Sequence, residues 1–158
     1  MEFERKFLVP NFNPKDHEVI ATRQILQYYL SDKPELRIRQ VIHNDGEPTC
    51  KFTYKGEGTL AREEHEFDIP RSEFESLRSK FCSTGAIVKT RYILKRDSDG
   101  NRIEVDIYQG KLEGLITAEV EFDSAQEAVD YIPPEWFGED VTENDMYKNR
   151  NLYKSQFQ

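Results

Sequence analysis

The chain has 158 residues, of which 37% are hydrophobic and 33% charged, with a mean hydropathy of -0.79 and a formal net charge of -8. A chain of this length forms one domain with a sizeable core, and it is too aromatic to be disordered. The negative charge argues against non-specific binding of nucleic acid or of an anionic membrane.

The sequence shows no targeting or metal-binding pattern of the common kinds. No apolar run approaches the roughly 20 residues that a membrane span needs, and the N-terminus lacks a signal-peptide pattern. Cys50 and Cys82 do not make a disulfide framework, and the three histidines are scattered. We therefore expect a soluble, cytoplasmic protein with a single domain over 1–158, no membrane or nucleic-acid partner and no histidine-based catalytic site.

Most of the eight predicted strands alternate charged and apolar residues with the period of two that is typical of β-strands, and residues 25–30 are an uncharged β-rich stretch. In the first of them Glu2, Glu4 and Lys6 share one face, whereas Phe3 and Phe7 lie on the other. The predicted strands cover residues 1–9, 25–30, 36–41, 50–55, 62–69, 87–94, 102–108 and 117–122. Turn signals rich in Gly, Asn and Asp separate several of them.

Helices are predicted between and after these strands. Residues 16–24 have a short helical pattern, and 72–81 form an amphipathic helix that begins with Ser72 as a cap. A further short helix over 124–132 ends before two prolines, and the last helix, over 142–156, begins at Thr142.

The charged faces carry as many acidic as basic residues. The acidic ones are Glu2, Glu4, Glu64, Glu66, Glu104, Asp106, Glu119 and Glu121, and the basic ones are Lys6, Arg37, Arg39, Lys51, Lys55, Arg62, Lys89 and Arg91. One interpretation is a β-sandwich or barrel whose charged faces meet water. The helices favour another, because they need an apolar sheet surface to pack on. They then cover the outside of a closed α+β barrel, and the charges line its lumen.

A lumen of this kind suits phosphate chemistry. Arginine and lysine side chains neutralise phosphoryl oxygens, whereas carboxylates bind hard cations such as Mg²⁺ or Mn²⁺ rather than zinc. If the first and last strands are neighbours, Glu2 and Glu4 meet Glu119 and Glu121 in a metal site. A second ion is expected near Glu64, Glu66, Glu104 or Asp106.

With these residues the sequence resembles the CYTH superfamily, also called the triphosphate tunnel metalloenzymes. The likeness rests on the family's N-terminal ExExK, here at 2–6, and on ordered matches at 36–39, 53–56, 62–70, 89–92, 104–106, 118–121 and 141–152. The chain departs from close bacterial members at Tyr28, where Gly is frequent, and at His65, where an aromatic residue is frequent. The resemblance implies an eight-stranded antiparallel β tunnel that binds triphosphate on basic residues and Mg²⁺ or Mn²⁺ on acidic ones.

The resemblance also implies a function, the metal-dependent hydrolysis of a triphosphate, above all inorganic tripolyphosphate. Alternatives are a class IV adenylate cyclase, a thiamine or nucleoside triphosphatase, and a module that only binds polyphosphate or nucleotide. The expected substrate ligands are Lys6, Arg37, Arg39, Lys55, Arg62, Lys89, Arg91 and Lys148. The chain is expected to act as a monomer or homodimer.

Two roles are expected within that set. Lys55 is the candidate general base, with Arg37 on a nearby strand supplying positive charge beside it, a pair to which the resemblance also points. The resemblance further suggests that the last helix closes one mouth of the tunnel and brings Lys148 near the phosphates. The alternative is that this helix docks on the outside through Met146, Tyr147, Leu152 and Tyr153.

Overall fold

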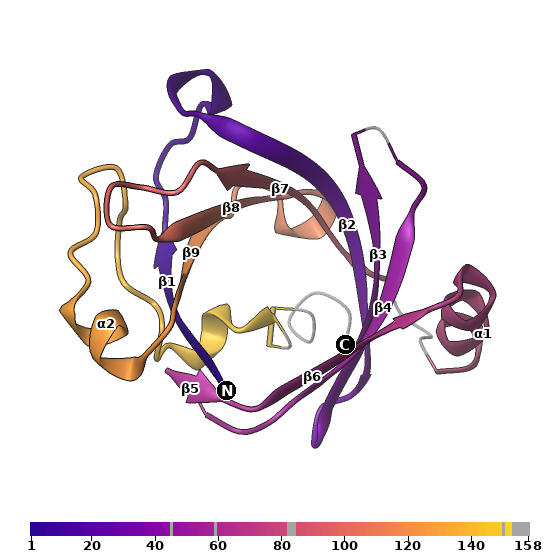
Figure 1. Ribbon diagram of the computed structural model, residues 1–158. Coiled ribbons are helices and arrows are strands. Elements are labelled where there is room, and N and C mark those ends of the chain that lie inside the picture. The colour runs from indigo at the N-terminus through magenta and orange to yellow at the C-terminus, as the bar shows by residue number, and fades with distance from the viewer. Residues whose placement is uncertain (45, 59, 82–84, 150, 153–158) are drawn as a thin grey trace.

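A computed structural model describes residues 1–44, 46–58, 60–81, 85–149 and 151–152. Within these ranges, nine antiparallel strands form one sheet that curls into a nearly closed barrel, seen along its axis in Figure 1. The strands are β1 (Glu2–Leu8), β2 (Val19–Ser31), β3 (Glu35–His43), β4 (Thr49–Lys55), β5 (Ala61–Arg62), β6 (Glu64–Ile69), β7 (Ile87–Leu94), β8 (Arg102–Tyr108) and β9 (Ile116–Phe122). The helices are α1 (Arg71–Phe81) and α2 (Ala125–Asp130), with 3-10 turns η1 (Pro14–Asp16), η2 (Gly110–Leu112) and η3 (Asp145–Tyr147).

The barrel closes because one stretch of chain forms the strands at both edges of the sheet. The strand order is β5-β1-β9-β8-β7-β2-β3-β4-β6, and only Glu63 separates β5 from β6. The predicted strand over 62–69 is therefore split, one part pairing with β1 and the other with β4, which explains nine strands in place of eight. The turn before β5 requires glycine, since Gly58 has a φ of +131° and a Cβ there would lie 2.2 Å from the Ala61 carbonyl oxygen.

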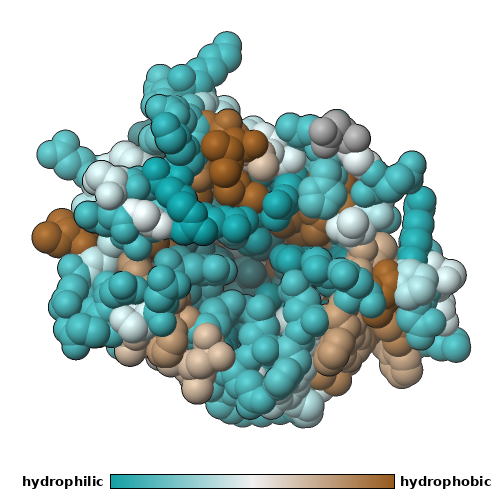
Figure 2. Space-filling view, in the orientation of Figure 1, coloured by the Kyte–Doolittle hydropathy of each residue, from teal (hydrophilic) through white to brown (hydrophobic). Residues whose placement is uncertain are grey.

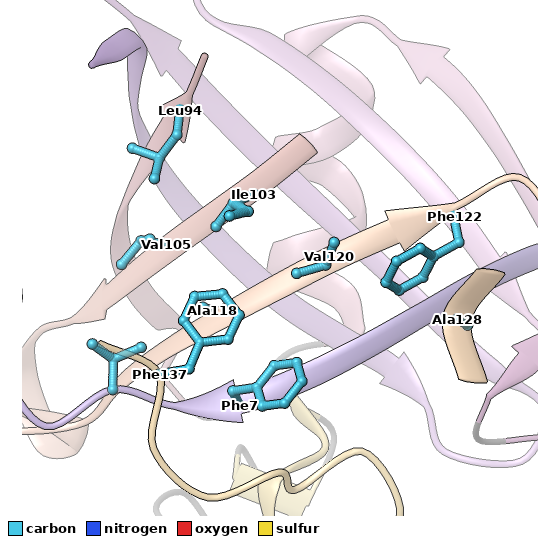
Figure 3. Packing of buried hydrophobic residues seen from close by; sticks show 10 residues of the cluster. Phe7, Leu94, Ile103, Val105, Ala118, Val120, Phe122, Ala128 and Phe137 are labelled. Carbon is cyan, nitrogen blue, oxygen red and sulfur yellow. The ribbon is translucent and has the colours of Figure 1, made fainter. Parts of the chain in front are cut away.

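The apolar faces of the strands point outward, where the helices cover them. Phe7, Val105, Ala118 and Val120 from β1, β8 and β9 form a cluster that α2 and Phe137 complete (Figure 3). On the other side, α1 places Phe74, fully buried, against Ile38 of β3 and Cys50 of β4. Burial of each such aromatic or branched side chain contributes roughly 1.5–3 kcal/mol. The predicted fold, an α+β barrel with helices outside and a charged lumen, is confirmed.

The register confirms that the first and last long strands are neighbours. In the β1–β9 pair, Glu4 lies opposite Glu121 and Lys6 opposite Glu119. Because residues two apart share a face, these four side chains and Glu2 all belong to the lumen side of the sheet.

The structure corrects three predictions of helix. Residues 16–24 are not a helix, because from Val19 onward the chain is β2, which pairs with β3 on one side and β7 on the other. Helix α1 begins at Arg71, so Ser72 is not its cap. Thr142 caps no helix either: its Oγ1 accepts a hydrogen bond from the Lys6 backbone N at 3.0 Å.

The chain after Thr142 is less regular than predicted. Asn144 caps η3, and helical backbone follows at 149 and 151–152. The rest of the predicted helix, 153–156, and Cys82 lie outside the described residues. No helix within the described ranges is long and apolar enough to cross a membrane.

Candidate active site

The lumen of the barrel is a pocket lined mainly by charged side chains. Figure 2 shows hydrophilic residues around a hollow at the centre of the face that looks along the barrel. The basic lining residues are Lys6, Arg23, Arg37, Arg39, Lys55, Arg62, Lys89, Arg91, Arg102 and Lys148. The acidic ones are Glu2, Glu4, Glu35, Glu64, Glu66, Glu104, Glu119 and Glu121. Thus every predicted substrate-binding residue and every predicted metal ligand except Asp106 lines this pocket.

Three carboxylates from β1 and β9 converge on one point. One oxygen each from Glu2, Glu4 and Glu121 lies within 4.8 Å of the other two. Burial, together with the nearby charges of Glu119 and Glu2, raises the pKa of Glu4 to about 8. Burial and neighbouring carboxylates also raise the pKa values of Glu2 and Glu121. A bound cation would relieve this repulsion, and a set of oxygen ligands fits Mg²⁺ or Mn²⁺.

Glu119, the fourth predicted ligand of that site, is held by cations instead. Its Oε1 lies 3.8 Å from Lys6 Nζ. Burial opposes its ionisation, but the charges of Lys6 and Arg91 prevail and lower its pKa to about 2. Lys6 Nζ also donates a hydrogen bond to the Tyr147 carbonyl at 2.6 Å, which ties the C-terminal segment to β1.

Lys55 lies between two carboxylates. Its Nζ is 3.0 Å from Glu2 and 2.9 Å from Glu64, and the side chain is 6% exposed. Although burial raises the pKa of Glu64, the Lys55 ammonium outweighs it and the pKa falls to about 2. Glu2 therefore belongs both to the carboxylate cluster and to the surroundings of Lys55.

Arg37 and Arg62 share a buried acidic partner, Glu35. Glu35 is 4% exposed and lies 4.0 Å from Arg37 and 3.6 Å from Arg62. Arg62 in turn lies 3.8 Å from Glu2 and 3.9 Å from Glu4. The predicted catalytic pair, Lys55 and Arg37, thus comes together with the carboxylate cluster in one part of the lumen.

On β7 and β8, Lys89 and Arg91 surround Asp106. Lys89 Nζ lies 2.8 Å from one oxygen, while Arg91 donates to both, at 2.8 and 2.9 Å. Asp106 is 1% exposed, and these cations hold its pKa well below its usual range against the opposing effect of burial. Burial lowers the pKa of Lys89 to about 8.

The residues predicted for a second ion do not come together. Glu104 pairs with Arg91 and Arg102, each at 3.0 Å. Glu66, on the opposite side of the barrel, pairs with Arg39 at 3.5 Å and accepts a hydrogen bond from Thr53 at 3.1 Å. Glu64, Glu66, Glu104 and Asp106 each face cations rather than one another.

Sequence reasoning missed several polar lining residues, among them Arg23, Gln27, Tyr29, Glu35, Arg102, Thr142 and Asn149. Glu35 continues the alternation of Arg37 and Arg39 by one step, and Arg102 shares a face with Glu104, so the period of two contains the signal for both. Arg23 was hidden by the wrong prediction of a helix over 16–24.

The C-terminal segment closes part of the lumen. Tyr147, Lys148 and Asn149 line the pocket, and the buried Tyr108 donates a hydrogen bond from its hydroxyl to Asn149 Oδ1 at 2.7 Å. Tyr147 and Leu152 also pack against Tyr108 and Ile87, whereas Met146 is exposed. Of the residues named in the outside-docking alternative, Tyr147 and Leu152 thus pack beside the lumen, and Tyr153 lies outside the described residues.

Comparison with known proteins agrees with this arrangement. The family model described as CYTH domain matches residues 1–149. The chain belongs to the CYTH domain family. An inorganic triphosphatase of Nitrosomonas europaea is 41% identical over 152 residues, which cover 96% of this chain and 95% of the relative. One of Acetivibrio thermocellus is 33% identical over 157 residues, with coverage of 99% and 95%.

A solved CYTH relative shares the fold. The crystal structure of the inorganic triphosphatase NE1496 aligns with a TM-score of 0.65 and 35% sequence identity, covering 96% of this chain and 93% of that one. The tunnel architecture predicted from the sequence is therefore shared with a protein named as a triphosphatase.

Proposed function

We propose that this protein is a divalent-metal-dependent inorganic triphosphatase that hydrolyses tripolyphosphate inside its tunnel. The observation that carries the proposal is the meeting, in one lumen, of the Glu2, Glu4 and Glu121 carboxylates with buried lysines and arginines. The curated relatives named inorganic triphosphatase, which match over nearly their whole length, support it.

The lining favours an inorganic substrate over a nucleotide. Eighteen of the 25 lining residues are Lys, Arg or Glu, and Tyr29 and Tyr147 are the aromatic ones among them. Such a wall has donors for phosphoryl oxygens along its length but little apolar surface for a base.

The basic residues bind and orient the phosphate chain. The proposed ligands are Lys6, Arg37, Arg39, Lys55, Arg62, Lys89, Arg91 and Lys148. Most of them pair with a glutamate or with Asp106, so they are already oriented before substrate enters. Phosphoryl transfer leaves little covalent work to the protein, and such preorganised charge stabilises the transition state.

Glu2, Glu4 and Glu121 would hold Mg²⁺ or Mn²⁺, with Glu119 beside them. The ion supplies neutralisation of phosphate charge and activation of water. We retain Glu64, Glu66, Glu104 and Asp106 as proposed acidic site residues. Their present partners are cations, so their role in the proposal is to orient Lys55, Arg39, Lys89 and Arg91.

Lys55 is the proposed proton acceptor, with Arg37 as the positive charge near it. The Nζ of Lys55 contacts the carboxylates of Glu2 and Glu64, and its N–H groups can donate to phosphate oxygens. Nearby positive charge is the condition under which a lysine serves as general base, and this is the role of Arg37 in the proposal.

We also propose that residues 1–158 act as one cytoplasmic domain, as a monomer or homodimer, with a small-molecule triphosphate as partner and no nucleic acid.

One substrate panel tests the function. Purified protein with Mg²⁺ or with Mn²⁺ is given tripolyphosphate, ATP and thiamine triphosphate, and released phosphate and cyclic AMP are measured. We expect phosphate from tripolyphosphate in greatest yield, and none after EDTA. Cyclic AMP from ATP would identify a cyclase, preference for ATP or thiamine triphosphate would identify the other triphosphatases, and tight binding without turnover a binding module.

A further inference from the structure

Arg5 of β1 points away from the lumen and joins two later segments of the chain. It lies on the outer face of the barrel, because the next residue, Lys6, lines the lumen and neighbouring strand residues face opposite ways. Its guanidinium is 17% exposed and donates to the carbonyl oxygens of Ala128 at 3.1 Å and Tyr131 at 2.9 Å, and to Asp140 Oδ2 at 2.8 Å. Arg5 thus connects β1 with Asp140 and with the end of α2, which lies outside the barrel (Figure 1).

The other oxygen of Asp140 binds Thr142. Asp140 Oδ1 accepts a hydrogen bond from the backbone N of Thr142 at 2.9 Å and another from its hydroxyl at 2.5 Å. Burial opposes the charge of Asp140, but the hydrogen bonds from Thr142 and Arg5 outweigh it and hold the pKa below its ordinary value. The carboxylate is therefore ionised at neutral pH, and it links Arg5 on the outside of the barrel to Thr142.

Thr142 carries this link to the lumen. Because its hydroxyl proton is donated to Asp140, its oxygen is free to accept, and it accepts from the backbone N of Lys6 at 3.0 Å. Val141 N donates to the Lys6 carbonyl oxygen at 2.9 Å, and both Val141 and Thr142 line the lumen. Both polar groups of the Lys6 backbone are thus bound by this segment, while Lys6 Nζ donates to the Tyr147 carbonyl oxygen at 2.6 Å.

A short run of hydrogen bonds continues from this point to Lys148. Asn144 N donates to the Val141 carbonyl oxygen at 3.0 Å, and Tyr147 N donates to the Asn144 carbonyl oxygen at 3.1 Å. Lys148 follows directly and lines the lumen. Because Lys148 is six residues beyond Thr142 and the backbone between them is bonded in this way, the position of Thr142 determines where Lys148 enters the lumen.

We propose that Asp140 is a positioning residue for triphosphate binding, which fixes Thr142 and, through Thr142, the place of Lys148 in the lumen. Arg5 holds the Asp140 carboxylate in turn. Neither Arg5 nor Asp140 lines the lumen, so the effect of Asp140 on a ligand there passes through other residues. This inference rests on the proposed function for its ligand, tripolyphosphate, but it concerns binding alone.

A double-mutant cycle on binding tests the link. The affinity for tripolyphosphate is measured by calorimetry in EDTA, without metal-dependent turnover, for the natural protein, Asp140→Ala, Lys148→Ala and the double variant. Glu139→Ala is the control, because it removes the same charge from the neighbouring, exposed side chain. The cycle separates the coupling between Asp140 and Lys148 from the effect of each residue alone.

Asp140→Ala should weaken the binding of tripolyphosphate about tenfold, the scale of one charge-assisted contact, and Glu139→Ala should leave it unchanged. In the Lys148→Ala background the further loss caused by Asp140→Ala should be about threefold or less, because the residue that Asp140 places is absent. Equal losses in both backgrounds would overturn the positioning role. So would Asp140→Ala with a lowered melting temperature and an unchanged affinity, since Asp140 would then be a structural brace alone.

Two substitutions of Thr142 decide the matter if Asp140→Ala does not fold. Thr142→Val keeps the shape but not the hydroxyl and should reproduce the loss of affinity, whereas Thr142→Ser keeps the hydroxyl and should bind like the natural protein. Weakened binding in both variants, or in neither, would contradict the link. Absence of tripolyphosphate binding by the natural protein in EDTA would overturn the inference, whereas binding without hydrolysis after addition of Mg²⁺ would overturn the proposed function alone.

Discussion

Glu4 and Glu119 lie on paired strands and respond to the same tunnel in opposite ways. Burial opposes the charge of both, but Lys6 and Arg91 compensate Glu119, whereas the strongest charge acting on Glu4 is that of Glu119 itself. The pKa of Glu119 is consequently about 2 and that of Glu4 about 8. At the residue scale, this difference marks Glu4 as a carboxylate whose charge the nearby Lys55 and Arg62 do not fully offset.

Glu4→Gln tests that place. Removing one charged ligand should raise the Mg²⁺ concentration needed for half-maximal activity by about tenfold or more and lower the maximal rate, while the fold stays intact. Titrations of activity with Mg²⁺ measure the metal requirement and the maximal rate, and circular dichroism checks that the fold is intact. Glu113→Gln, an exposed substitution outside the tunnel, is the control. Unchanged metal dependence in both Glu4→Gln and Glu121→Gln would remove the metal assignment.

Lys55→Ala separates a proton acceptor from a phosphate ligand. As general base, Lys55 should account for a fall in maximal rate of about 10²-fold or more, with a smaller loss of substrate affinity. Lys95→Ala is the control, since Lys95 is exposed and pairs only loosely with the exposed Glu18, at 3.5 Å. A raised Michaelis constant with an unaltered rate and pH profile would make Lys55 a clamp only.

At the scale of elements, the strands were predictable because the lumen enforces the period of two over nearly every one. The stretch 19–24 was not, because Thr22, Arg23 and Gln24 give no apolar alternation, and pairing with both β3 and β7 decides its conformation. The split at Glu63 depends on barrel closure, a tertiary property that local alternation does not contain.

The site residues could be predicted from the sequence where the strands that carry them could be predicted. Most charged residues on recognised strands were found, including the β1 and β9 carboxylates, although Arg102 of β8 was not named as a site residue. The sequence does not tell which carboxylates form the proposed metal cluster and which pair with a lysine or arginine, because this depends on distances across the lumen. Asp106 and Glu121 occupy equivalent charged faces of β8 and β9, yet only Glu121 joins the three-carboxylate group.

The segment after β9 has two separable parts. Residues 138–141 add to the edge of β1, with Gly138 N donating to Leu8 O at 2.7 Å and Val141 N to Lys6 O at 2.9 Å. Residues beyond 143 reach the lumen through Tyr147 and Lys148. A cut between the two parts removes the lumen contacts of Tyr147, Lys148 and Asn149 without uncovering β1.

Truncation after Glu143 should therefore yield a folded protein with impaired turnover. The Michaelis constant for tripolyphosphate should rise about tenfold or more, because Lys148 and the closure of the mouth are lost. The melting temperature should fall by a few degrees as Tyr108 and Ile87 become exposed. Lys148→Ala in the full chain separates the lost charge from the lost closure. Undiminished activity in the folded truncate would contradict this role.

At the scale of the whole molecule, the fold separates charge. Ten basic and eight acidic residues line the tunnel of a chain whose net charge is -8, so the excess of negative charge is carried outside the lumen. The helices make this arrangement possible, because they cover the apolar outer faces of the strands. The charged faces of the same strands then line the lumen. An interior with excess positive charge attracts a polyanion, while a negative exterior disfavours nucleic acid.

This balance predicts how stability depends on pH and metal. Glu64 and Glu119 have pKa values of about 2, below the ordinary 4.5, so their contribution is present above pH 4.5 and lost as the pH falls toward 2. Glu4 has a pKa of about 8, so its contribution is present below pH 4.5 and lost as the pH rises through 8. In EDTA the melting temperature should therefore peak near pH 5 and fall by several degrees toward pH 8.

Mg²⁺ should remove the decline on the alkaline side, because the ion replaces the proton among Glu2, Glu4 and Glu121. Glu4→Gln in EDTA should also flatten the curve between pH 5 and 8, while the loss of stability on the acid side remains. Melting curves at half-unit steps of pH, with Mg²⁺ and with EDTA, measure both effects. If the natural protein in EDTA kept a constant melting temperature from pH 5 to 8, the raised pKa of Glu4 would be wrong, and the three carboxylates would carry no charge repulsion for a metal ion to relieve.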